Sequence, residues 1–114
     1  MLMHCAGEYG YSNAVDIFDA TSGRWTTASL SVARGGLAAT SLPKQGFAMF
    51  AGGITGQGVY SNAVDIFDAK VWTTAVLSKV RQNLDATSLP NQGLAIFAGG
   101  VVDGTHVFLV LSFC

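Results

Sequence analysis

A ten-residue segment, Tyr-Ser-Asn-Ala-Val-Asp-Ile-Phe-Asp-Ala, occurs twice in this chain of 114 residues, at 11–20 and at 60–69. Three further segments recur in the same order: WTTA at 25–28 and 72–75, ATSLP at 39–43 and 86–90, and FAMFAGG at 47–53 as LAIFAGG at 94–100. The two tyrosines that open the decapeptides are 49 residues apart, whereas the tryptophans are 47 apart, so the second copy is two residues shorter between these points. A period in the high forties predicts an array of supersecondary units.

Each period predicts four short β-strands. Segments of five or six residues rich in β-branched and aromatic side chains alternate with turn-forming residues, and no window carries apolar residues at helical spacing for three turns. The four strands expected in one complete unit are 37–42, 47–51, 63–67 and 72–77. Two more are expected before it, at 14–18 and 25–30, with a worn remnant at 1–7, and two after it, at 84–89 and 94–98.

Composition excludes several classes of protein. Half of the residues are hydrophobic and only 11% are charged, which is too apolar for a disordered chain. The six cations are scattered singly and the net charge is −1, which argues against a nucleic-acid surface. The longest apolar run, 107–111, is far shorter than the roughly 20 residues of a membrane-spanning helix, and residues 1–8 do not resemble a signal peptide. We therefore expect a cytoplasmic protein without a membrane partner.

The repeat resembles that of the kelch family, which combines a glycine doublet, a later aromatic residue and, after six intervening residues, a tryptophan. Two doublets, Gly52-Gly53 and Gly99-Gly100, and two aromatic pairs, Phe18–Trp25 and Phe67–Trp72, carry the resemblance. The second pair is separated by only four residues, and phenylalanine replaces the family's usual tyrosine in both copies. Arg34 and Arg81 fall where kelch repeats often have an arginine before the first strand.

The resemblance implies an all-β protein made of kelch-type β-propeller blades, as in galactose oxidase. The whole chain, 1–114, forms a single partial repeat region with units at about 11–53 and 60–100 and a divergent tail at 101–114. One complete blade lies between two half-blades. Because closed propellers have about four to eight blades, the chain is not expected to close a ring by itself. We expect it to self-associate, as a ring of several copies or as aggregates, or else to belong to a longer protein.

The glycine doublets and tryptophans are expected to have structural roles. Glycine permits positive φ and close backbone approach at a strand end, and a phosphate-binding loop would need a downstream Lys-Ser/Thr or a third glycine that opens a helix. Trp25 and Trp72 are expected to pack between blades.

Nothing in the sequence predicts catalysis, a cofactor or a metal site. Asp16, Asp19, Asp65 and Asp68 recur with the unit, as turn and strand-edge residues do. His4 and His106 are the only histidines, and Cys5 and Cys114 are expected to be free thiols, although they could pair if the termini meet. The copper of galactose oxidase needs Tyr, His and Cys ligands that this chain lacks. The chain is therefore not expected to be an enzyme.

The remaining function is binding through loops. By the kelch resemblance, the chain is a scaffold that binds a protein partner through the loops at one end of the blades. Tyr60, Arg34 and Arg81 are the candidate contact residues, because Tyr and Arg are enriched at binding hot spots; alternatively, both arginines hydrogen-bond loop carbonyls. Asp85 replaces the small Ala38 of the first copy and could face a channel or pair with Arg81. Two other functions stay open: an inactive fragment of a longer kelch protein, or weak carbohydrate binding through Tyr9, Tyr11 and Tyr60.

Overall fold

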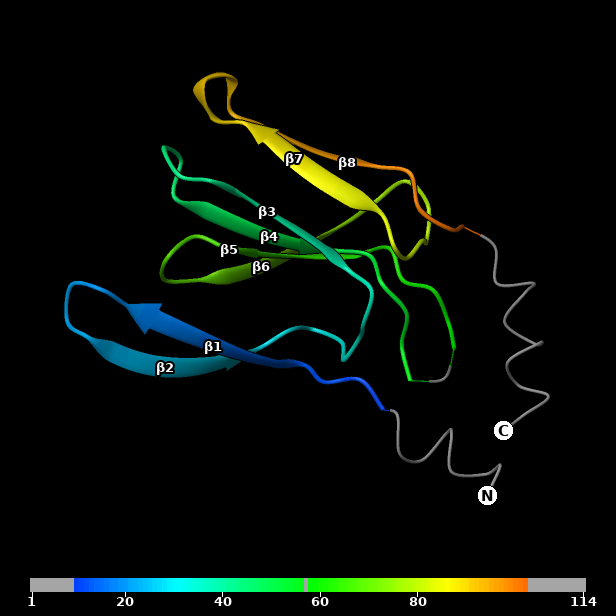
Figure 1. The fold of residues 1–114 in the computed structure, drawn as a ribbon, viewed down its shortest axis with the longest axis horizontal. Helices are drawn as coiled ribbons and strands as arrows, with labels where there is room; N and C mark the ends of the chain where they lie inside the picture. Colours follow the sequence, from blue (N-terminus) through cyan, green and yellow to red (C-terminus); the bar gives the residue numbers. More distant parts are fainter. Residues whose placement is uncertain (1–9, 57, 103–114) are drawn as a thin grey trace.

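Residues 10–56 and 58–102 form three small antiparallel sheets in a computed structural model of the chain (Figure 1). The strands are β1 (Ala14–Asp19), β2 (Arg24–Ser29), β3 (Ala38–Leu42), β4 (Phe47–Ala51), β5 (Ala63–Phe67), β6 (Trp72–Val76), β7 (Asp85–Leu89) and β8 (Leu94–Ala98), with a short 3₁₀ helix, η1 (Pro90–Gln92), before β8. These ranges, with the gap at 57, contain no α-helix. The prediction of an all-β fold is therefore confirmed.

The central sheet has four strands in the order β3-β4-β5-β6, and a two-stranded hairpin lies on either side of it: β1-β2 and β7-β8. The eight strands lie within two residues of the predicted boundaries, and the strand predicted at 84–89 begins at Asp85. The remnant predicted at 1–7 and most of the tail at 101–114 lie outside the described residues, as do Cys5, Cys114, His4 and His106.

The two hairpins show where the second copy loses two residues: β1 and β2 have one more cross-strand pair, Asp19↔Arg24, beyond the Phe–Trp pair. In the first copy, β1 and β2 are joined by residues 20–23, and Gly23 at φ 74° donates its N–H to the carbonyl of Asp19 at 2.7 Å. In the second, the carboxylate of Asp68 accepts hydrogen bonds from the N–H groups of Lys70 and Val71, at 3.1 and 2.8 Å. Ala69 takes φ 81° in this turn, a conformation that an L-residue adopts only at an energetic cost.

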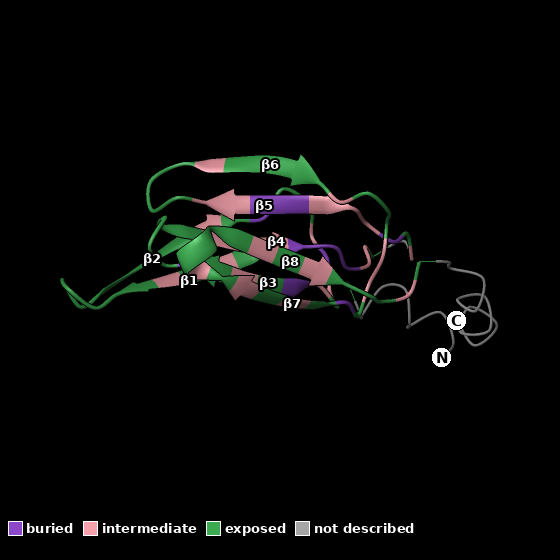
Figure 2. Ribbon diagram, turned by 90° about the horizontal axis from the view of Figure 1, so that it is seen from above, coloured by how far each residue is buried: buried purple, intermediate pink, exposed green. Residues whose placement is uncertain are grey.

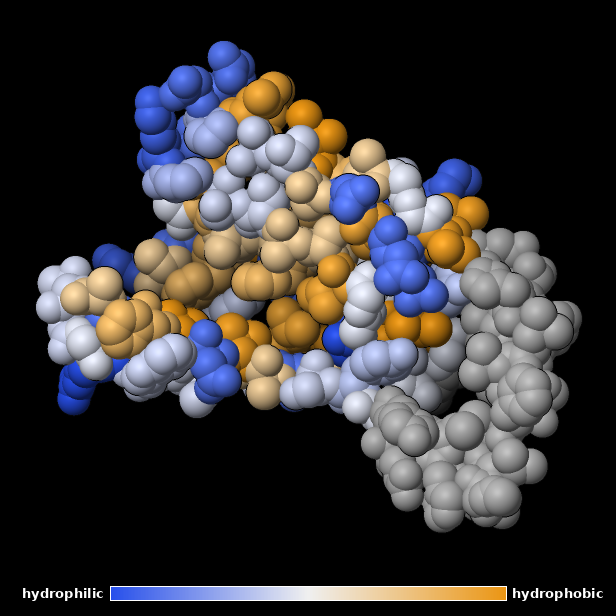
Figure 3. Space-filling view, in the orientation of Figure 1, coloured by the Kyte–Doolittle hydropathy of each residue, from blue (hydrophilic) through white to orange (hydrophobic). Residues whose placement is uncertain are grey.

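Burial is concentrated in the central sheet and in the loops that lead into it. Figure 2 shows β5 as the most buried strand, while β6 and most of β2 are exposed. The buried apolar residues are Leu30, Ala38, Leu42, Ala51, Tyr60, Val64 and Leu84. Apolar residues also gather where β3 and β4 lie between the two hairpins, and hydrophilic ones at the tips of the outer turns (Figure 3). Among the described residues, no large apolar side chain in this small core is completely buried.

The described part of the chain contains no helix with the length and apolar content needed to cross a membrane.

Candidate binding face

The strands of all three sheets run between two ends that differ in character. One end carries the tight turns at 20–23, 43–46, 68–71 and 90–93. The other carries three longer connections, 30–37, 52–62 and 77–84, which join one sheet to the next or β4 to β5 (Figure 1). We call this second end the loop face. Longer loops held on a rigid sheet are where binding residues commonly lie, so the loop face is the candidate functional site.

An ion pair fixes the base of the loop face. Arg34, in the loop before β3, donates from Nη1 to the Oδ2 of Asp65 in β5 at 3.0 Å, and its side chain is fully buried. Its Nη2 donates to the carbonyls of Phe50 and Ala63, at 3.1 and 3.3 Å, at the ends of β4 and β5. One guanidinium therefore joins the entry loop to two strands of the central sheet.

The same carboxylate also fastens the first hairpin to the central sheet. Asp65 accepts hydrogen bonds from the backbone N–H and the hydroxyl of Ser31, which follows β2, each at 3.2 Å. Asp65 is only 2% exposed. A buried charge is strongly unfavourable without partners, and here the carboxylate has both a cation and three donor contacts. The sequence placed Asp65 among turn and strand-edge residues, and its role as a buried link was not predicted.

Two of the three predicted contact residues are buried. Arg34 is 2% exposed and Tyr60 is 6% exposed. The ion pair with Asp65 buries Arg34 and the packing of the loop buries Tyr60, so their contact with a partner stays a prediction that burial does not favour. The alternative, that the arginines hydrogen-bond loop carbonyls, holds for Arg34 only at Val32, at 3.5 Å, because its shorter bonds go to carbonyls of β4 and β5. The hydroxyl of Tyr60 accepts a hydrogen bond from the side chain of Gln82 at 3.3 Å.

Arg81 occupies the equivalent position in the second copy but has fewer partners. It is half-buried, and its Nη2 donates to the carbonyl of Phe97 at 3.5 Å, as Arg34 does to Phe50. Among the described residues its guanidinium makes no ion pair. Asp85 is exposed at the start of β7 and does not pair with Arg81.

The first glycine doublet lies where backbones of neighbouring units meet. A Cβ on Gly52 would come within 2.7 Å of the carbonyl oxygen of Arg81, and one on Gly53 within 2.5 Å of that of Gly35. The N–H of Gly53 donates to the Arg81 carbonyl at 2.8 Å. Both doublets have positive φ, but a Cβ on Gly99 would meet nothing within 4 Å, because no further unit faces it in the described part of the chain.

The two aromatic pairs have similar ring separations and different surroundings. The rings of Phe67 and Trp72 stack with centroids 4.8 Å apart, and those of Phe18 and Trp25 lie 5.0 Å apart. Trp72 is half-buried and also contacts the ring of Phe50 at 6.2 Å. Phe18 and Trp25 are 51% and 68% exposed, so they do not pack between sheets in this chain as expected.

The loop face carries exposed valines that the sequence analysis did not single out. Val32, Val59 and Val80 stand one on each of the three loops and are 41%, 59% and 40% exposed. Their signal in the sequence is a valine among turn-forming and polar residues, at the same end of successive units. Exposed apolar side chains on a fixed backbone can contribute to binding by losing water-accessible surface.

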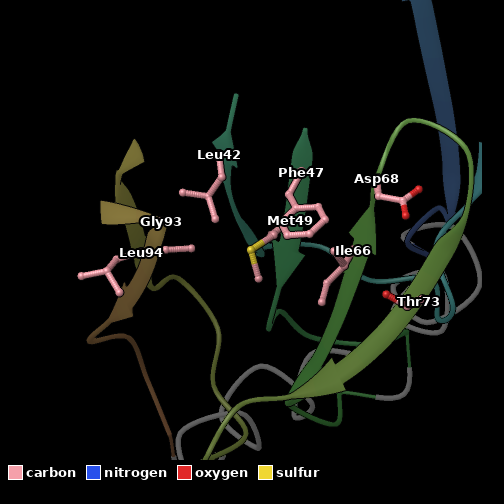
Figure 4. Close-up of a pocket in the computed structure, with 9 residues that line it drawn as sticks. Leu42, Phe47, Met49, Ile66, Asp68, Thr73, Gly93 and Leu94 are labelled. Carbon is pink, nitrogen blue, oxygen red and sulfur yellow. The ribbon is translucent and has the colours of Figure 1, made fainter. Parts of the chain in front are cut away.

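A hollow of about 500 Å³ is a groove between the central sheet and β8. Leu42, Phe47, Met49 and Ile66 line it from the central sheet and Leu94 from the opposite side, with Asp68 and Thr73 at one end (Figure 4). Hydrogen bonds from the N–H groups of Val71 and Lys70 lower the pKa of Asp68. Its carboxylate is therefore an acceptor within the turn at 68–71. The described residues contain no group of three or more His, Cys, Asp or Glu side chains that could hold a metal ion.

No family model and no curated protein matches this chain.

Proposed function

We propose that the chain is a partial kelch-type β-propeller that binds a protein partner through its loop face, without catalysing a reaction. The observation that carries this proposal is the set of three exposed valines, Val32, Val59 and Val80, on loops whose base is held by the buried Arg34–Asp65 ion pair. A rigid base lowers the entropy lost when the loops bind, so more of the contact energy appears as affinity.

The propeller assignment is supported by the repeated sequence together with the order β3-β4-β5-β6 of the central sheet. In this assignment the central sheet is one blade, β1-β2 is the outer half of the preceding blade and β7-β8 the inner half of the next. The positive φ angles of the doublets and the ring contact within each Phe–Trp pair support the same assignment. Blades made of repeated units would present their loops side by side at one end.

The test compares two matched pairs of exposed apolar residues. The variant Val32→Ser/Val59→Ser alters the loop face, and the control Val71→Ser/Leu89→Ser alters residues of similar exposure beside the tight turns at the opposite end. Proteins captured from a cell extract by the wild-type chain are identified by mass spectrometry, and the dissociation constant of each is then measured with the purified partner. We expect the loop-face variant to weaken binding about 10-fold or more and the control to leave it unchanged. Equal binding by both variants would contradict the proposal.

Carbohydrate binding has less support. Tyr60 is buried, Tyr9 lies outside the described residues, and Tyr11 is 44% exposed. A glycan array is therefore expected to give no signal, and a specific signal lost on Tyr11→Ala would favour that function instead.

A further inference from the structure

The two outer hairpins repeat the two halves of the central four-stranded sheet. The register of β7 with β8 repeats that of β3 with β4: Ala86 faces Phe97 as Ala39 faces Phe50. The register of β1 with β2 repeats that of β5 with β6: Phe18 faces Trp25 as Phe67 faces Trp72. Among the described strands, none pairs with the outer edge of β8 or with the outer edge of β1.

The residues that form the buried ion pair of the loop face have equivalents elsewhere in the chain, and these equivalents do not contact one another. Ser78 and Arg81 repeat the Ser-x-x-Arg segment of Ser31 and Arg34, and Asp16 repeats Asp65 within the identical decapeptide. Arg81 already donates to the carbonyl of Phe97, the equivalent of Phe50, and has no carboxylate partner among the described residues. Asp16 is exposed, and the described part of the chain gives its carboxylate no ion pair or hydrogen bond.

The apolar surfaces are complementary in the same way. In the central sheet, Phe67 and Trp72 face the first hairpin across a smaller hollow that Val15 and Ile17 also line. The equivalent pair, Phe18 and Trp25, is exposed. On the opposite face of the central sheet, the groove at Met49, Ile66 and Thr73 is covered by β8 on one side and is open on the other (Figure 4).

We propose that β1-β2 of a second copy of this chain pairs with β8 and completes a sheet of the order β7-β8-β1-β2. The register transferred from β4 and β5 places Ala95 opposite Phe18 of the second copy and Phe97 opposite its Asp16. That register brings the second copy's Asp16 to Arg81 and Ser78, and its Phe18 and Trp25 over the open groove.

The two hairpins of one chain cannot form this sheet with each other, because they lie on opposite sides of the central sheet (Figure 1). The pairing is therefore between copies and runs head to tail. Each copy supplies strands for two four-stranded sheets, so two to four copies would close a propeller of about four to eight blades. The pairing itself does not rest on the proposed binding of a partner by the loop face.

The first experiment measures the mass of the 114-residue chain by light scattering after size-exclusion chromatography. We expect two to four times the chain mass of 11.9 kDa. Asp16→Lys or Arg81→Glu alone should raise the dissociation constant about 100-fold or more, because each leaves like charges facing one another at a buried site, and the double variant should restore assembly. The control Asp19→Lys/Arg24→Glu reverses the exposed pair at the other end of the same hairpin and should assemble like the wild type.

The second experiment tests the register and does not depend on the charge variants folding. In a chain with Cys5 and Cys114 replaced by serine, Phe18→Cys and Ala95→Cys should cross-link copies on oxidation. The pair Ile17→Cys and Ala95→Cys should not, because a shift of one residue places the side chain on the other face of the strand. A monomer without cross-links at 50 μM, or an oligomer that neither reversal weakens and that cross-links in neither register, would overturn the proposal. Loss of binding by the loop-face valine variants alone leaves both results unchanged.

Discussion

The two decapeptides are identical in sequence and adopt the same local structure, yet they differ greatly in burial. In both, the serine hydroxyl accepts a hydrogen bond from the N–H two residues later, at 2.9 Å for Ser12 and 3.0 Å for Ser61. Tyr11, however, is 44% exposed and Tyr60 is 6% exposed. Identical segments thus form similar strands, Ala14–Asp19 and Ala63–Phe67, while the units on either side determine what is buried.

Asp65 and Asp16 occupy equivalent positions in the two decapeptides but have different partners. Asp65 lies in β5 beside β4, and the loop before β3 brings Arg34 to its carboxylate. Asp16 lies on the outer edge of the first hairpin, where no described strand brings a cation. The same carboxylate is a buried structural link in one copy and a solvated side chain in the other. Substitutions at equivalent positions therefore measure what a neighbouring unit contributes. All four predictions below apply to the Arg81→Glu background, in which the chain is expected to be monomeric.

The largest expected difference is between Asp65→Ala and Asp16→Ala. Removing Asp65 leaves the buried Arg34 guanidinium without its counter-ion and should lower the free energy of unfolding by about 3–5 kcal/mol. Removing Asp16 should change it by less than about 0.5 kcal/mol, as for other surface substitutions. Urea unfolding followed by circular dichroism measures both values. Equal losses would show that the two aspartates have equivalent surroundings.

The tryptophans should differ in the same direction but less. Trp72 is half-buried between Phe67 and Phe50, so Trp72→Ala should cost about 2–3 kcal/mol, at or below the low end of the range for fully buried aromatic residues. Trp25, 68% exposed, should cost about 1 kcal/mol or less, mainly through its contact with Phe18. The fluorescence of Trp25 alone, in a Trp72→Phe chain, should be red-shifted relative to that of Trp72 alone. A larger loss at Trp25 than at Trp72 would contradict the comparison.

These differences mark what could and could not be predicted from the sequence. Strands and turns follow from local patterns, which is why FAMFA at 47–51 and LAIFA at 94–98 were placed correctly. Arg34 is buried by its contact with Asp65, about 30 residues away in the sequence. Tyr60 is buried by packing between loops, where Gln82 hydrogen-bonds its hydroxyl. Residue type suggested a surface role for both, and no local pattern indicates that Asp65 lies beside Arg34. The exposed valines were missed because valine by itself predicts a buried strand.

The glycines provide a test on the backbone. Gly52 and Gly99 have nearly the same φ, 76° and 77°, so an alanine at either position is strained to the same extent. Only at Gly52 would the new Cβ also press on the Arg81 carbonyl and on Leu84. Gly52→Ala should therefore lower the free energy of unfolding by about 2 kcal/mol and Gly99→Ala by about 1 kcal/mol. A Gly99→Ala variant that is as unstable as Gly52→Ala would indicate that a further unit contacts Gly99.

The smallest expected effect concerns the turn at 68–71 and depends on pH. The N–H groups of Val71 and Lys70 stabilise the ionised carboxylate of Asp68 and lower its pKa below 3.8. Because the pKa is lower in the folded chain, this contribution to stability is complete above 3.8 and disappears as the pH falls through the lowered value. Asp68→Asn should thus be slightly less stable than its parent chain at pH 7 and equally stable at the lowest pH at which both remain folded. Titration of the side-chain carboxyl by NMR should give a midpoint below 3.8, and a midpoint at or above that value would mean that the short turn does not hold the carboxylate as described.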